Sequence, residues 1–169
     1  MPEVLASGKY LRLVRRDGWE WAERTNTSGV VVIAALTPAG EVLLVEQDRM
    51  PVGARVLEMP AGLAGDVEGA EDEALAEAAR RELVEETGWD AERMEEVTGG
   101  PVSAGMTSET LTFFRATGLR RVGDGGGDAS EDIVVHAVPL GEVEGWIRAR
   151  QAEGVLVDPK VYAGLFFLR

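Results

Sequence analysis

The feature that most restricts the fold of this chain is a run of apolar, largely β-branched residues at positions 30–36. A short unbroken run of this kind is typical of a strand that is buried in a protein core. Pro38, Ala39 and Gly40 follow it, and this tripeptide predicts a turn into a second apolar run at positions 41–47. We therefore expect a central hairpin of two strands.

Shorter patterns complete the expected fold. Residues 10–25 alternate loosely around Asp17-Gly18, which predicts a hairpin, and Pro60-Ala61-Gly62 is expected to end a strand and begin a loop. Further strands are expected at 55–59, 94–99, 111–117 and 133–139, and helices at 72–87, 140–153 and 159–168. The expected class is α/β: an α/β/α sandwich with a mixed sheet at 29–169, preceded by an N-terminal β-hairpin segment at 1–28.

Composition limits the chemistry that this chain can perform. The 169 residues are 45% hydrophobic, which suits one domain with a single core. The chain has no cysteine and one histidine, His136, which excludes disulfides, thiolate catalysis and a zinc site built from thiolates. The remaining candidates are carboxylates, Lys or Arg, and a metal ion held by oxygen ligands.

Charge and hydropathy restrict the partners. The formal net charge of −13 would repel nucleic acid, whereas a small phosphorylated substrate stays feasible where divalent cations neutralise the acid locally. Charged residues interrupt the first thirty positions, and no stretch reaches the ~20 apolar residues that cross a bilayer. We therefore expect a cytoplasmic protein that binds neither nucleic acid nor membrane.

The segment 81–89, Arg-Glu-Leu-Val-Glu-Glu-Thr-Gly-Trp, ends the expected helix at 72–87. On a helix, Glu82 and Glu86 stand one turn apart on one face, and Glu85 lies beside them. Carboxylate oxygens are ligands that Mg²⁺ prefers, so this crowding of like charge predicts a divalent-cation site, with Arg81 able to hold one glutamate in place. A solvated acidic helix face without a metal is the alternative interpretation.

The same segment resembles the second half of the Nudix box, Arg-Glu-apolar-any-Glu-Glu-any-Gly-apolar, at every specified position. That family has a glutamate eight residues before the arginine, and Glu73 stands in this place. The opening glycine of the box would fall at Val67, but Gly62 looks like its true counterpart. The loop at 63–72 would then be five residues longer than in the standard box.

The resemblance is strongest to the ADP-ribose pyrophosphatase branch of this family, and it covers most of the chain in order. The N-terminal hairpin, the stretch before the box, the substrate loop and the last helix of that branch each have a similar segment here. These segments are 8–10 and 19–24, 45–53 and 57–63, 103–109, and 157–162. In the substrate loop, Ala104 stands where the branch commonly has proline.

The resemblance implies a metal site on the acidic helix. Glu82 and Glu86 would ligate Mg²⁺ together with the backbone carbonyl of Ala61, and Mn²⁺ could substitute for Mg²⁺. Glu85 would contribute to the metal or to its water network.

A catalytic base is also implied. Glu109, at the end of the substrate loop, is the first candidate because a loop carboxylate can order over bound substrate and activate a water. Glu131, after the glycine-rich stretch 123–130, is the rival. Glu109 could instead be a loop residue that serves only solubility.

Residues that contact the substrate follow from the same resemblance. Arg49 and Glu58 would face the diphosphate and ribose, and Gly105 and Met106 belong to the substrate loop. Arg49 and Glu58 could alternatively form an ordinary surface ion pair, and Met106 could serve packing.

The aromatic residues of the N-terminal hairpin have an implied role as well. Tyr10 and Trp19 would stack on adenine across a homodimer that exchanges its N-terminal hairpins, with Arg24 nearby. Without the resemblance, the same aromatic residues are expected to pack in the hairpin.

The implied reaction is Mg²⁺-dependent hydrolysis of a phosphoanhydride, which would convert ADP-ribose into AMP and ribose 5-phosphate. One alternative is a pyrophosphatase for another nucleotide sugar, such as GDP-mannose. Two others are a Nudix module that binds a nucleotide without catalysis, and a structural acidic protein whose stability is independent of Mg²⁺.

Overall fold

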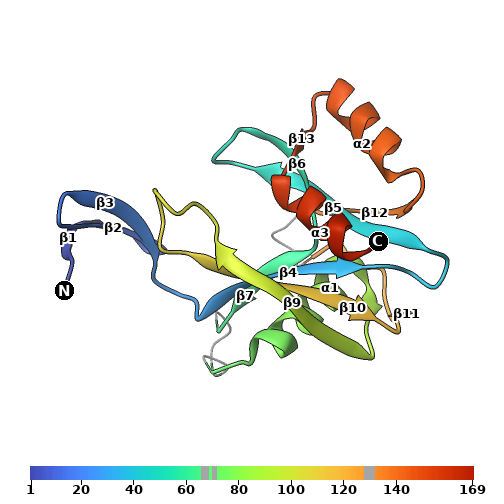
Figure 1. Ribbon diagram of the computed structural model, residues 1–169, viewed down its shortest axis with the longest axis horizontal. Helices are drawn as coiled ribbons and strands as arrows, with labels where there is room; N and C mark the ends of the chain where they lie inside the picture. The colour runs from blue at the N-terminus through green and yellow to red at the C-terminus, as the bar shows by residue number, and fades with distance from the viewer. Residues whose placement is uncertain (66–68, 70–71, 128–131) are drawn as a thin grey trace.

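The computed structural model describes residues 1–65, 69, 72–127 and 132–169. Its main body contains two four-stranded sheets (Figure 1). The first sheet has the order β7-β4-β10-β9, with β4 (Gly29–Ala35), β7 (Ala61–Ala64), β9 (Arg93–Pro101) and β10 (Thr110–Thr117). The second has the order β12-β5-β6-β13, with β5 (Glu41–Arg49), β6 (Ala54–Glu58), β12 (Val134–Pro139) and β13 (Leu156–Val157).

Each of the two sheets is mixed. The pairs β4–β10 and β6–β13 are parallel, and the other pairs are antiparallel. A small two-stranded sheet joins β8 (Trp89–Asp90) to β11 (Arg120–Arg121). The helices are α1 (Leu75–Thr87), α2 (Val143–Ala152) and α3 (Pro159–Phe167), and no helix among the described residues is long and apolar enough to span a membrane. The expected α/β class is confirmed.

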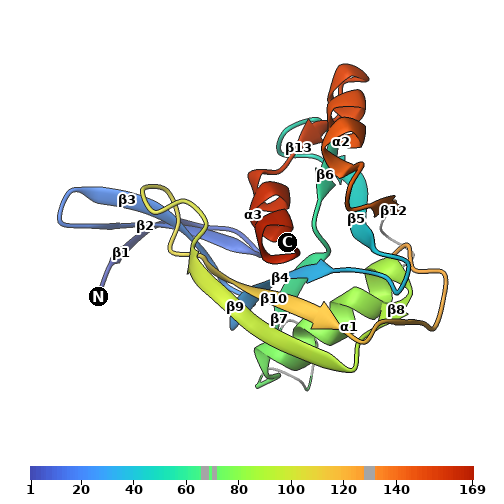
Figure 2. The same cartoon turned by 45° about the vertical axis from the view of Figure 1, so that its right-hand side comes forward.

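Strand β4 explains why the run at 30–36 is apolar throughout. Successive side chains of a strand point to opposite faces of its sheet. Val31 and Ile33 join the core beneath α1, whereas Val32 joins the core that contains residues of α2 and α3. Figure 2 shows α1 and α3 on opposite faces of the sheet that contains β4 and β10. Both faces of β4 are therefore buried, which is the situation that a continuous β-branched run favours.

The expected central hairpin is wrong, although both of its strands exist. β4 and β5 lie in different sheets, and a single antiparallel bridge, Leu36↔Val42, connects their ends. β5 pairs instead with β6 and β12, while β4 pairs with β7 and β10. The turn at Pro38-Ala39-Gly40 thus passes the chain from one sheet to the other, and one expected mixed sheet becomes two.

Two further boundaries differ from the expectation. Pro60 is followed by a strand, β7, and not by a loop, because Ala61 and Gly62 pair with Val32 and Val31 of β4. α1 begins at Leu75, three residues later than expected, whereas its C-terminal cap at Gly88 is confirmed by a left-handed φ of 74°. The longer loop expected at 63–72 lies partly outside the described residues, and Val67 is among those outside.

The N-terminal segment forms a three-stranded antiparallel sheet, with β1 (Glu3–Ser7), β2 (Leu11–Arg16) and β3 (Trp19–Arg24). The expected hairpin at Asp17-Gly18 is confirmed, since both residues have positive φ, and β1 is an additional strand. This sheet extends away from the two larger sheets (Figure 1). Backbone hydrogen bonds from Ala22 N to Met106 O (2.9 Å) and from Ser108 N to Ala22 O (3.2 Å) attach it to the loop between β9 and β10.

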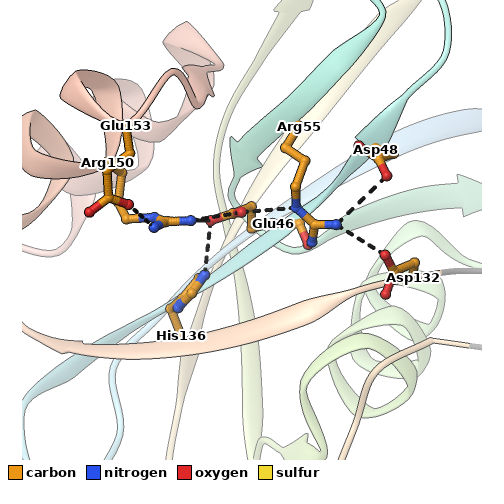
Figure 3. Close-up of polar contacts among 7 residues, drawn as sticks. All are labelled: Glu46, Asp48, Arg55, Asp132, His136, Arg150 and Glu153. Atoms are coloured by element: carbon orange, nitrogen blue, oxygen red, sulfur yellow. Dashed lines mark hydrogen bonds and ion pairs between the residues drawn. The ribbon is translucent and has the colours of Figure 1, made fainter.

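A buried ion cluster fixes the second sheet to α2 (Figure 3). The Glu46 carboxylate accepts hydrogen bonds from Arg150 Nη2 (2.6 Å) and Arg55 Nε (2.9 Å), and His136 Nε2 lies 3.2 Å from it. Burial alone would raise the pKa of Glu46, but these hydrogen bonds outweigh burial and hold that pKa below its usual value. The carboxylate therefore stays charged and joins β5, β6, β12 and α2.

Candidate active site

The packing of α1 directs its acidic face toward β7. Ala78, Ala79 and Leu83 are fully buried and join β4 residues in the core beneath the sheet. Glu82 and Glu86 lie on the neighbouring face of the helix, which approaches the first residues of β7. The Glu86 side chain is consequently only 4% exposed although it is acidic.

Two close approaches fix these glutamates against β7. Ala61 N donates a hydrogen bond of 2.9 Å to Glu86 Oε2. The Glu82 carboxylate lies where a side chain on Gly62 would be, since a Cβ built there would stand 2.0 Å from Glu82 Cδ. A side chain at position 62 would therefore displace the Glu82 carboxylate, which supports the identification of Gly62 as the counterpart of the first glycine of the box.

Arg81 holds the acidic face together from the side. Its guanidinium donates to Glu82 Oε1 (2.8 Å), Glu85 Oε2 (3.1 Å) and both oxygens of Glu73 (3.2 Å each), and to the carbonyl of Leu63 (2.9 Å). Glu73 and then Glu82 raise the pKa of Arg81 above its ordinary value, although burial opposes the rise. The guanidinium stays charged and restrains several carboxylates, where the sequence had suggested one.

A cavity of about 410 Å³ opens beside this face, and we call it the acidic cavity. It collects side chains from α1, β3, β5, β6, β10 and α3. Its charged lining consists of four carboxylates and three cations: Glu58, Glu82, Glu86, Glu109, Arg24, Arg49 and Lys160. Ala61 and Gly62 line it too. The structure thus brings together most of the residues that the sequence selected, including both glutamates expected to bind metal.

Two ion pairs lie in the lining of the acidic cavity. Arg49 Nε donates to Glu58 Oε2 at 2.7 Å, and Arg24 Nε donates to Glu109 Oε1 at 2.8 Å. The second pair connects the N-terminal sheet to the loop between β9 and β10 and holds the first candidate base at the cavity wall. Because Arg49 and Glu58 line the cavity, their pair is more than an isolated contact of the outer surface.

The glycine-rich loop after β11 caps the C-terminal end of α1. Gly126 N donates to Glu86 O at 2.8 Å, and Gly127 N donates to Glu85 O at 3.0 Å. Gly125 has a φ of 72°, and a Cβ there would lie 2.4 Å from the carbonyl carbon of Thr87. The loop therefore satisfies helix carbonyls that would otherwise lack partners, and it does so at the residues that bear the acidic groups.

Several predicted site residues lie outside the acidic cavity. The Glu85 side chain is half exposed and contacts Arg81. Trp19 is exposed on β3, and Tyr10 is exposed between β1 and β2, where the ammonium of Lys9 lies 4.7 Å from the Tyr10 ring centroid. Gly105 and Met106 belong to the loop that carries Glu109, and Met106 is 74% exposed. Glu131 lies outside the described residues.

Two polar residues of the cavity lining were not selected from the sequence. Gln47 is nearly buried at the end of β5, and Lys160 stands in the first turn of α3. No local pattern marks Gln47. For Lys160 the one weak signal in the sequence is the rarity of lysine, because Lys9 is the only other lysine of the chain.

The lining fits a hard divalent cation. Glu82, Glu86 and the Ala61 peptide supply oxygen donors, and the missing side chain at Gly62 leaves the space that Glu82 occupies. Among the described residues, no three Asp, Glu or His side chains are grouped closely enough to bind an ion by themselves. Mg²⁺ needs no such group, because it usually keeps several waters and binds through one or two carboxylates plus substrate phosphates.

Comparison with known proteins gives a consistent result. A family model described as NUDIX domain matches residues 25–160. A methanol dehydrogenase activator from Bacillus methanolicus is 32% identical over 142 residues, which cover 83% of this chain and 72% of that protein. An ADP-ribose pyrophosphatase from Mycobacterium tuberculosis is 33% identical over 138 residues, which cover 81% of this chain and 63% of that protein.

Two further proteins are similar to this chain. An ADP-ribose pyrophosphatase from Bacillus subtilis is 35% identical over 91 residues, which cover 54% of this chain and 46% of that protein. The chain therefore spans less than two thirds of the length of either pyrophosphatase. A solved structure described as an ADP compounds hydrolase superimposes with a TM-score of 0.71 at 19% identity and covers 100% of this chain and 90% of its own. Because the sequence identity to this solved structure is only 19%, the similarity shows a shared fold alone.

Proposed function

Since this chain belongs to the NUDIX hydrolase family, we propose that it hydrolyses the diphosphate bond of a nucleoside diphosphate sugar, with ADP-ribose as the first candidate. The observation that carries the proposal is the acidic cavity, in which Glu82 and Glu86 face the start of β7 close to Arg24, Arg49 and Lys160. The similarity to two ADP-ribose pyrophosphatases supports the choice of substrate.

Glu82, Glu86 and the carbonyl of Ala61 would hold the divalent ion, which we propose to be Mg²⁺. When bound, the ion supplies Lewis-acid neutralisation of the diphosphate charge. Arg49 and Arg24 lie at the cavity wall, where they can bind phosphate oxygens that the ion leaves uncovered. Glu58 holds the Arg49 guanidinium in place.

We propose Glu109 as the general base. It lines the acidic cavity, whereas Glu85 faces Arg81 outside it. The water oxygen forms a new bond to one phosphorus, the bond from that phosphorus to the bridging oxygen breaks, and Glu109 takes the proton that the water loses. In ADP-ribose the products are AMP and ribose 5-phosphate. Arg24 restrains the Glu109 carboxylate before substrate binds.

The test is a hydrolysis assay over ADP-ribose, GDP-mannose and other nucleoside diphosphate sugars with Mg²⁺. The nucleoside monophosphate product is measured by chromatography for wild type and Glu86→Gln. Glu77→Gln is the matched control, because Glu77 is an exposed glutamate of the same helix. We expect ADP-ribose to turn over fastest and Glu86→Gln to lose about 10²- to 10³-fold in turnover. Equal turnover in the three proteins would refute the site.

We also propose that the N-terminal segment at 1–28 forms the contact of a homodimer. Large apolar side chains are exposed on this segment: Val4, Tyr10, Leu11, Leu13 and Trp19. An exposed apolar set of this kind commonly marks an interaction surface. Light scattering should give a dimer mass for wild type and a monomer mass for Leu13→Glu. We also propose that Trp19 stacks on the base of a substrate bound to the partner, so Trp19→Ala should raise KM. A monomeric wild type would contradict both the dimer contact and this stacking.

A further inference from the structure

A second cavity, which we call the α3 groove, adjoins the acidic cavity. Its volume is about 530 Å³, and it lies between the strands β9 and β10 and the first turns of α3. Val102, Leu111 and Lys160 line both cavities. A ligand in the acidic cavity can therefore continue into the groove without leaving the protein surface. No residue selected from the sequence for substrate binding lines this groove.

Lys160 has a fixed position where the two cavities meet. Asp158 is the N-cap of α3, its side chain accepts a hydrogen bond of 2.8 Å from Lys160 N, and Pro159 occupies the first helical turn. Asp158 N in turn donates to Leu57 O at 3.0 Å. Leu57 immediately precedes Glu58, so the start of α3 is anchored to the strand that carries a wall of the acidic cavity.

The three cations of the acidic cavity have different partners. Arg24 and Arg49 each pair with a carboxylate of the same cavity, Glu109 and Glu58. The Lys160 ammonium pairs with Asp158, whose side chain belongs to the lining of the α3 groove. Lys160 is thus the cation that faces both spaces. A lysine ammonium on its flexible stem suits a phosphate whose position changes between substrate and product.

The walls of the α3 groove are mostly apolar, with a gap at Gly100. The apolar lining includes Pro101, Leu111, Phe113, Pro159 and Ala163. Gly100 pairs directly with Leu111 across β9 and β10, so a side chain at 100 would point to the same face as Leu111. A Cβ at Gly100 meets no atom within 4 Å. The missing side chain leaves room for a ring next to a phosphate.

We propose that Lys160 binds one phosphate of the substrate and that the α3 groove holds the ribose unit attached to this phosphate. The inference rests on the proposed diphosphate hydrolysis and assigns it a further binding residue. Both halves of ADP-ribose carry a ribose 5-phosphate, so the shared chemistry is a pentose 5-phosphate. Binding measurements with AMP and with ribose 5-phosphate distinguish the nucleoside half from the sugar half.

The first test measures binding of the non-hydrolysable α,β-methylene analogue of ADP-ribose by calorimetry with Mg²⁺. Lys160→Met should weaken binding about 10- to 100-fold, as expected for loss of a hydrogen bond to a charged group. Lys160→Arg should retain most of the affinity. Arg148→Met is the matched control, because Arg148 is an exposed cation of α2 outside both cavities and its loss changes the net charge equally. Wild-type affinity in Lys160→Met, or no binding by wild type, overturns the proposal.

The groove itself is tested by Gly100→Leu, which places a side chain in the open space and leaves residue 160 a lysine. Gly145→Leu, where a Cβ also meets no atom within 4 Å, is the control on α2. Lys160→Met and Gly100→Leu should weaken the same fragment, AMP or ribose 5-phosphate. Weakening of different fragments, or of neither, contradicts a shared subsite. Thermal unfolding of each variant shows whether the fold is intact.

Kinetics separate this inference from the proposed function. In Lys160→Met we expect KM for ADP-ribose to rise about 10- to 100-fold with kcat nearly unchanged, the sign of binding equally strong in ground and transition states. If wild type hydrolyses ADP-ribose and Lys160→Met has the same KM, the inference fails and the proposed function stands. If wild type binds the analogue through Lys160 but hydrolyses no compound, the proposed function fails and the subsite stands.

Discussion

Two glutamates of this protein have the same burial and different surroundings. Glu46 is 3% exposed and Glu86 is 4% exposed. The Glu46 carboxylate is enclosed by Arg150, Arg55 and His136, so protein groups complete its environment (Figure 3). Glu86 accepts a hydrogen bond from Ala61 N and lines a cavity that it shares with other carboxylates.

Burial of a carboxylate therefore has a different consequence at Glu46 and at Glu86. Taking a carboxylate out of water is costly unless opposite charge or hydrogen bonds replace the water. At Glu46 the arginines provide this compensation permanently, so the cluster acts on stability. At Glu86 the neighbouring carboxylates add negative charge to a space that a cation can enter, so the same residue type serves binding and chemistry.

The largest predicted effect is that of the substitution Glu86→Gln. Glu86→Gln should reduce kcat for ADP-ribose by about 10²- to 10³-fold, because one carboxylate of the cation site is lost. Its stability should be unchanged or higher, because repulsion among acidic groups is relieved. Steady-state kinetics and urea unfolding of the same preparation measure both quantities. A variant that is much less stable but equally active would reverse the roles of the two sites.

The second prediction compares two candidate catalytic residues, Glu109 and Glu85. Glu109→Gln should lower kcat about 10²-fold, at the lower end of the range for a general base. Glu85→Gln should lower it less than tenfold, because the Glu85 side chain lies outside the cavity and contacts Arg81. A larger loss for Glu85→Gln would transfer the role of base to Glu85.

The third prediction concerns the buried ion cluster around Glu46. Glu46→Gln should lower the free energy of unfolding by roughly 1–3 kcal/mol, less than for a fully buried pair because Arg55 and Arg150 are partly exposed. Its kcat per folded molecule should remain within about threefold of wild type, since no effect on the chemistry is expected. Urea unfolding gives the first value, and active-site-normalised kinetics give the second. A large loss of kcat in the folded variant would mean that the cluster takes part in catalysis.

The smallest predicted effect is a pH dependence of stability near His136. Burial lowers the pKa of His136 more than the neighbouring Glu46 raises it, so the folded state resists protonation. As pH falls below the ordinary histidine value of about 6.5, the unfolded state takes up a proton first and stability decreases. His136→Gln should remove this decrease between pH 7.5 and 5.5 in unfolding experiments. An identical decrease in the variant would assign it to another group.

Glu46 predicts a separate, more acidic step. Its pKa is held below the usual glutamate value of about 4.3, so its contribution is complete above that pH. The contribution is lost as pH falls through the lower pKa of the folded state.

The parts of the structure that sequence reasoning predicted well are set by local physics. α1 combines good helix formers, a buried stripe at Ala79 and Leu83, and a left-handed glycine at 88, all of which act within a few residues. The acidic face follows directly from this helix. The strands at 30–36 and 41–47 also exist, because their apolar character alone favours burial.

The predictions that were wrong or missing concern features that depend on residues distant in sequence. Whether β4 pairs with β5 or with β10 is decided by tertiary packing, and a turn such as Pro38-Ala39-Gly40 is compatible with either pairing. β7 was missed because Gly62 suggested a loop, whereas the glycine serves the approach of Glu82, twenty residues later. Lys160 comes from the last helix, and only the fold places it in the same cavity as Glu58.

The most direct test of the central claim is a crystal structure with Mg²⁺ and the α,β-methylene analogue of ADP-ribose. We predict metal density between the carboxylates of Glu82 and Glu86 and the carbonyl of Ala61, with the diphosphate oxygens completing its coordination. Metal and diphosphate bound elsewhere, with Glu82 and Glu86 contacting only protein groups, would contradict the account.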